Sequence, residues 1–69
     1  TAEARGLINA IEQNYEVGDT ITTPQIKKIA PAGCFTPSQN RLSISVMNQL
    51  IRFGVLEKSG ANYTYISTM

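Results

Sequence analysis

Hydrophobic residues near the start of the chain recur with the spacing of an α-helix. Leu7, Ile8 and Ile11 fall on one face, and most charged residues of this stretch lie off that face. The run stops at the turn sequence Val17-Gly18-Asp19. The pattern predicts a helix over residues 2–15.

A short strand and a second helix are expected next. Residues 20–22 are β-branched but too few for an independent strand, so they are expected to add an edge to a hairpin. Thr23 suits an N-cap and Pro24 the first helical position, which predicts a helix over residues 24–30. On this helix the isoleucines should point inward and the lysines outward (Ile26, Ile29; Lys27, Lys28).

A second Thr-Pro-Ser sequence, Thr36-Pro37-Ser38, predicts the start of a longer helix over residues 38–53. Gly54 follows where a left-handed residue commonly ends a helix. One side of this helix is apolar and includes Ser43, Met47, Leu50 and Ile51, with Ile44 and Val46 beside them. The opposite side carries a polar stripe without an acid, formed by Arg41, Ser45, Asn48 and Arg52.

From Val55 onward the hydrophobic period changes to two. Residues 55–58 and 63–67 are predicted strands, and the short loop between them contains a glycine, which indicates a hairpin. Tyr63 and Tyr65 share one face of the second strand, where core packing or a sheet edge is favoured over stacking on bases. Phe35, Phe53 and Ile66 are expected in the core.

Composition bounds the class of protein. The 69 residues suffice for one small domain, and 42% apolar content argues against disorder. No apolar run approaches the roughly 18 residues of a membrane span, and no signal-peptide pattern opens the chain. An intracellular location, cytoplasmic or with the nucleoid or nucleus, is therefore expected. The chain begins at Thr1 without an initiator Met, which suggests a processed form or a fragment of a longer protein.

Catalytic and metal chemistry find no support in the residue types. Cys34 is the single cysteine and the chain has no histidine, so neither an internal disulfide nor a zinc ligand set is expected. Paired carboxylates, a nucleophile motif and a Gly-rich phosphate loop are also missing from the sequence. We expect no enzymatic activity and no cofactor, and Cys34 is expected to be a small, partly buried loop residue.

The net charge of +1 conceals an asymmetry. Residues 1–19 hold four acids against one cation, a net of −3, whereas residues 20–69 hold five cations against Glu57, a net of +4. A basic second part of this size favours an anionic partner, bound weakly and in a salt-dependent way.

The order of the expected elements resembles the winged-helix superfamily over nearly the whole chain. The closest local match is residues 47–58. Members of that superfamily very often end the recognition helix with a leucine four residues before a glycine, then enter the first wing strand with two apolar residues and a charged one. The matching residues here are Leu50, Gly54, Val55, Leu56, Glu57 and Lys58.

The resemblance implies an α+β fold whose third helix enters the major groove of double-stranded DNA, with the hairpin wing on the adjacent backbone. Base contacts are expected from the start of that helix, with Arg41 suited to guanine and Gln39 or Asn40 to adenine. Phosphate contacts are expected from the second helix and the wing. The implied DNA-binding residues are Lys27, Lys28, Ser38, Gln39, Asn40, Arg41, Ser45, Asn48, Arg52, Lys58 and Asn62, with Ser59 beside them.

Two other functions remain open. A winged helix can instead dock a protein partner or another domain of a larger machine, an alternative that the acidic first helix and the few cations favour and the acid-free stripe opposes. Binding of RNA or single strands would require Tyr63 and Tyr65 to be exposed. A homodimer formed by parts outside this segment is compatible with either, and a role in transcription, replication or DNA processing is left open.

Overall fold

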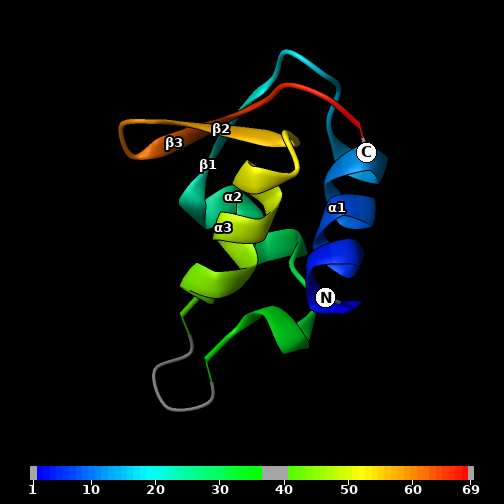
Figure 1. The fold of residues 1–69 in the computed structure, drawn as a ribbon, viewed down its shortest axis with the longest axis vertical. Coiled ribbons are helices and arrows are strands. Elements are labelled where there is room, and N and C mark those ends of the chain that lie inside the picture. The colour runs from blue at the N-terminus through cyan, green and yellow to red at the C-terminus, as the bar shows by residue number, and fades with distance from the viewer. Residues whose placement is uncertain (1, 37–40, 69) are drawn as a thin grey trace.

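The computed structural model describes residues 2–36 and 41–68. In these residues three α-helices, a short 3-10 helix and a three-stranded antiparallel sheet form a small domain (Figure 1), which confirms the α+β part of the predicted fold class. In chain order the elements are α1 (Ala2–Asn14), β1 (Thr20–Thr22), α2 (Thr23–Ile29), the 3-10 helix η1 (Ala32–Cys34), α3 (Ile44–Arg52), β2 (Leu56–Ser59) and β3 (Asn62–Tyr65).

Most element boundaries lie close to the predicted ones. β1 matches residues 20–22, and α1 ends one residue before the predicted limit. β2 begins one residue later than expected, and β3 covers residues 62–65 instead of 63–67. Gly54 has a φ of +77°, which confirms the left-handed residue predicted after the third helix. Within the described residues, no helix is long and apolar enough to cross a membrane.

The N-cap of α2 is Thr22, so the prediction of Thr23 was wrong by one position. The Thr22 hydroxyl accepts a hydrogen bond from the backbone amide of Gln25 at 3.4 Å. The side-chain oxygen of Gln25 in turn accepts from the backbone amide of Thr22 at 2.9 Å. This reciprocal pair is a capping box. It needs a Glu or Gln three residues after the cap, which Thr22 has in Gln25 and Thr23 lacks, so the helix begins one residue earlier and takes in Thr23 and Pro24.

The third helix is much shorter than predicted. α3 begins at Ile44, with Ser43 as N-cap, whereas a start at residue 38 was expected. Arg41 and Leu42 are extended, and Leu42 forms an antiparallel bridge with Phe35. Arg41 is therefore not a helical residue. The predicted contacts Ser38, Gln39 and Asn40 lie outside the described residues.

The core lies where α1, α2, α3 and the sheet meet. Leu7 and Ile11 of α1 pack with Leu50 of α3, and all three side chains are fully buried. Tyr65 closes this core from the sheet with 1% exposure, so its predicted packing role is confirmed. Packing on this common centre positions α3 relative to the hairpin.

Three residues expected inside or beside the core are exposed. Phe53 is 50% exposed, Ile66 40% and Ile44 77%. Because α3 presents only its Val46, Met47 and Leu50 side to the core, Ile44 at its first turn and Phe53 at its end project away from that side. The placement of Phe53 and Ile66 in the core was therefore wrong.

The sheet has the order β1-β3-β2, with β3 in the centre. Lys58 of β2 lies opposite Tyr63 of β3, which in turn lies opposite Ile21 of β1. Residues directly opposite in antiparallel strands point to the same face. The face that holds Ile21 is buried in the core, so Lys58 and Tyr63 also point toward the helices.

Candidate nucleic-acid interface

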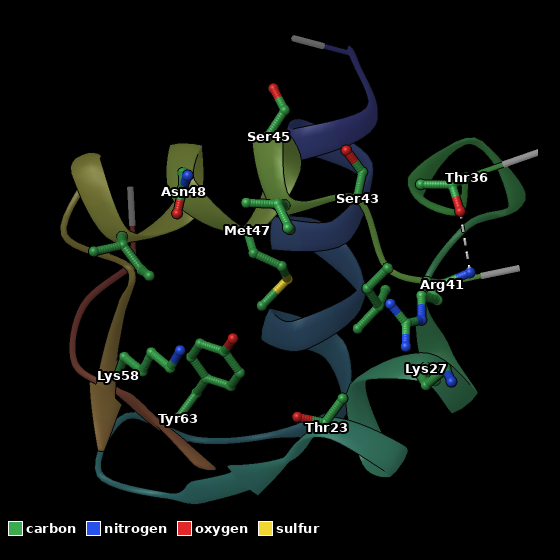
Figure 2. Close-up of a pocket in the computed structure, with 13 residues that line it drawn as sticks. Thr23, Lys27, Thr36, Arg41, Ser43, Ser45, Met47, Asn48, Lys58 and Tyr63 are labelled. Atoms are coloured by element: carbon green, nitrogen blue, oxygen red, sulfur yellow. Dashed lines mark hydrogen bonds between the residues drawn. The ribbon is translucent and has the colours of Figure 1, made fainter. Parts of the chain in front are cut away.

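A groove of about 670 Å³ opens between α3, the β2–β3 hairpin and the start of α2. Figure 2 shows α3 along one side, Lys58 and Tyr63 across from it, and Lys27 and Arg41 at one end. The lining residues are Thr23, Lys27, Thr36, Arg41, Leu42, Ser43, Ile44, Ser45, Met47, Asn48, Ile51, Lys58 and Tyr63.

Cations from three separate segments border this groove. Lys27 comes from α2, Arg41 from the extended residues before α3, and Lys58 from β2, and all three are exposed. In the described part of the chain, no Asp or Glu lines it. The groove is therefore a site of positive potential with hydroxyl groups from Thr23, Ser43 and other lining residues.

The absence of acid from this lining follows from the strand period. Glu57 and Lys58 are neighbours on β2, so their side chains leave the sheet on opposite faces. Glu57 pairs with Thr64 on the face away from the groove, while Lys58 pairs with Tyr63 on the groove side. The remaining acids belong to α1 and to residues 16–19, on segments that do not line the groove.

Backbone hydrogen bonds hold Arg41 at the groove although it is not helical. The Thr36 amide donates to the Arg41 carbonyl at 2.7 Å, and the Arg41 amide donates to the Thr36 hydroxyl at 3.3 Å (Figure 2). The adjacent bridge between Phe35 and Leu42 continues this pairing. The Arg41 side chain thus leaves a tethered segment instead of a free loop.

The groove has an apolar lining as well as its cations. Met47 reaches from α3 toward Tyr63 of β3 (Figure 2), and Leu42, Ile44 and Ile51 also line it. Tyr63 is half-buried, whereas Tyr65 is fully enclosed. The paired exposure of both tyrosines that single-strand binding was expected to need is therefore not present.

The structure gathers some of the predicted DNA-binding residues and separates others. Lys27, Arg41, Ser45, Asn48 and Lys58 line the groove. The other described candidates lie elsewhere: Lys28 is exposed on α2, Asn62 begins β3 and Ser59 ends β2, and Arg52 borders a separate hollow with Gln49 and Phe53.

Several lining residues were not singled out as contacts from the sequence. Thr23 was treated as a cap, and Ile44, Met47 and Ile51 as parts of the apolar side of the helix. Thr23 instead donates from its hydroxyl to the Ala61 carbonyl at 3.3 Å, which ties the start of α2 to the hairpin turn. The register of the predicted hairpin could have indicated Tyr63 as a lining residue, because pairing it with Lys58 places both side chains on the core side of the sheet.

Cys34 is more buried than predicted. It ends η1 with no exposed surface, and its thiol donates to the Glu3 carbonyl at 3.3 Å. Burial, followed by the negative charge of Glu3, raises the pKa of the Cys34 thiol above its ordinary value. Among the described residues, no group of three or more His, Cys, Asp or Glu side chains is arranged to hold a metal ion.

No protein-family model matches the chain, and neither the curated proteins nor the solved structures include a match.

Proposed function

We propose that this chain is a winged-helix module that binds double-stranded DNA. The observation that carries the proposal is that Lys27, Arg41 and Lys58 converge from three segments on one acid-free groove. The element order is the one on which the sequence resemblance rests, and β1 adds an edge strand to the β2–β3 hairpin as expected. In this arrangement α3 enters the major groove and the β2–β3 hairpin lies beside it.

The exposed side of α3 supplies the surface for the bases. Ser45, Asn48 and Arg52 are all exposed and fall three or four residues apart, so they share one side of the helix. Ser45 and Asn48 also line the groove, whereas Arg52 lies at the far end of α3. Base contacts are therefore assigned to the first two turns, and Arg52 is placed near a phosphate.

The side of the groove formed by the hairpin and the start of α2 suits a DNA backbone strand. Lys58 borders the groove across from α3 and Lys27 borders it at one end (Figure 2), and Thr23 and Tyr63 add hydroxyl groups to its lining. Ammonium, guanidinium and hydroxyl groups are common partners of phosphate oxygens. With about three phosphates neutralised, the logarithm of the binding constant should fall with the logarithm of salt concentration with a slope of about −3.

Titration of the isotope-labelled chain with a short mixed-sequence duplex tests this proposal. At about 50 mM salt, amide shifts should cluster at residues 23–27, 41–48 and 58–63, and they should shrink at about 200 mM salt. Amides of α1 act as the internal control because no residue of that helix lines the groove. Unmoved groove amides at low salt would contradict DNA binding.

One observation favours a protein-docking module as the second candidate. Leu42, Met47 and Ile51 line the groove beside Ile44, which makes part of its surface apolar. An acidic peptide with apolar side chains would fit the same combination of charge and hydrophobic lining. If the groove binds such a peptide and not DNA, the amide signals of the groove should stay unmoved in the DNA titration.

A further inference from the structure

Ile44 is the most exposed of the large apolar residues in the described chain, with 77% of its surface accessible. It lies in the first turn of α3 and lines the groove. A side chain this exposed loses little contact with water when the protein folds, so it contributes little to folding through burial. Its apolar surface remains available to a ligand.

Asn48 stands one helical turn after Ile44 and is also exposed. Side chains four residues apart on a helix are neighbours, with Cβ atoms about 5–6 Å apart. Both residues line the same groove. The start of α3 therefore presents an apolar group and a carboxamide side by side.

This pair matches the major-groove edge of A·T base pairs. Adenine offers an N6 donor and an N7 acceptor, which a single carboxamide can satisfy together. Thymine carries the 5-methyl group, which apolar side chains contact in the major groove. Guanine and cytosine in unmodified DNA offer no such methyl group.

We propose that Ile44 and Asn48 form a subsite for A·T base pairs, in which Ile44 contacts the thymine 5-methyl group and Asn48 bonds to adenine. This inference rests on the proposed binding of duplex DNA. It goes further by naming the base pair that is preferred and the two side chains that select it.

Removal of the thymine methyl group tests the inference directly. Two duplexes of alternating A·T and T·A pairs are compared, one with thymine and one with deoxyuridine in place of every thymidine. Because each sequence alternates, the chain meets equivalent base pairs in whichever register it binds. Anisotropy titrations at about 50 mM salt should show wild-type chain binding the thymine duplex about fourfold more tightly, as expected for one buried methyl-sized group. Ile44→Ser should bind both duplexes equally.

Two further variants separate the roles. Asn48→Ala should keep the preference for thymine over deoxyuridine and lose most of its preference for alternating A·T over alternating G·C duplex, about tenfold for a good bidentate contact. Val17→Ser is the matched control, because Val17 is 56% exposed and does not line the groove. It should behave as wild type.

The outcomes distinguish this inference from the function on which it rests. Equal, salt-sensitive binding of both duplexes by the wild type would overturn the A·T subsite and leave DNA binding intact. A thymine preference that persists in Ile44→Ser would also overturn it, because the methyl group would then act through DNA shape or another residue. Absence of binding to any duplex would contradict the proposed function itself.

Discussion

The Ser43 amide donates to the Cys34 carbonyl oxygen across a distance of 2.7 Å. In a helix starting at residue 38, that amide would instead donate to the carbonyl four residues before it. The bond to Cys34 and the neighbouring Phe35–Leu42 bridge hold residues 41–43 extended along residues 34–36. This pairing shortens α3 and places Arg41 beside the groove, away from the helix that the sequence predicts for it.

The two adjacent lysines of α2 provide a matched test of the groove. Lys27 and Lys28 are both exposed on the same helix, but only Lys27 lines the groove in the described structure. Lys27→Gln should weaken duplex binding and reduce the magnitude of the salt slope by about one unit, because one phosphate contact is lost. Lys28→Gln should change the slope by much less. Titrations at several salt concentrations measure both, and equal effects would contradict a role specific to the groove.

The capping box at Thr22 predicts a difference between neighbouring threonines. Thr22→Ala should lower the free energy of unfolding by about 1 kcal/mol, because the Gln25 amide loses its side-chain acceptor. Thr23→Ala removes a methyl group and the hydroxyl whose exposed hydrogen bond reaches the Ala61 carbonyl, and should cost less than about 0.5 kcal/mol. Urea denaturation of both variants gives the comparison. A larger loss in the free energy of unfolding for Thr23→Ala than for Thr22→Ala would indicate that Thr23 is the N-cap.

Two residues at the C-terminal end of α3 should respond differently to truncation. Leu50 is fully buried between α1 and the sheet, so Leu50→Ala should lower the free energy of unfolding by about 3 kcal/mol through lost burial and a cavity. Phe53→Ala should cost less than about 1 kcal/mol, since half of the surface of that residue is already exposed. Thermal and urea unfolding test this ordering. Comparable losses in the free energy of unfolding would show that Phe53 contributes to the core as much as Leu50 does.

The stability of the fold should fall at alkaline pH. Burial raises the pKa of the Cys34 thiol above its ordinary value of 9.0, and burial likewise raises the pKa of the Tyr65 hydroxyl above 10.0. The folded chain therefore keeps both protons after the unfolded chain begins to release them. The free energy of unfolding should be constant with respect to these groups below pH 9 and should decrease as the pH rises above it.

Urea denaturation between pH 7 and pH 10.5 measures this dependence. Cys34→Ala should flatten the decline that begins near pH 9 and leave the later contribution of Tyr65. A Cys34→Ala chain with the same decline between pH 9 and pH 10 would show that the buried thiol is not its source.

The parts of the fold set by local patterns could be predicted from the sequence. The helical period of Leu7, Ile8 and Ile11 located α1, and the change to period two after Gly54 located the hairpin. Residues 20–22 were recognised as an edge strand because they are β-branched and bounded by turn signals. Such patterns depend on residues that are near neighbours, so the chain carries them without reference to tertiary contacts.

The start of α3 could not be predicted because a distant contact decides it. Helical period and a Thr-Pro-Ser cap favour a start at residue 38, but the Cys34 carbonyl captures the Ser43 amide and Leu42 pairs with Phe35. A local helix from residue 38 competes in free energy with the pairing of residues 41–43 along residues 34–36. Hydrophobic periodicity reports only on the helix.

The candidate site, like the fold, depends partly on the sequence alone and partly on tertiary contacts. The sequence alone determined the residue types that the site uses, namely an acid-poor second part of the chain, the polar stripe at Ser45 and Asn48, and a lysine on each flanking element. Only the tertiary structure decided that Lys27, Arg41 and Lys58 border one groove, that Arg52 lies apart from it, and that Ile44 is exposed at its edge. The physical reason is that side-chain direction follows strand register and helix packing, which form between segments far apart in the chain.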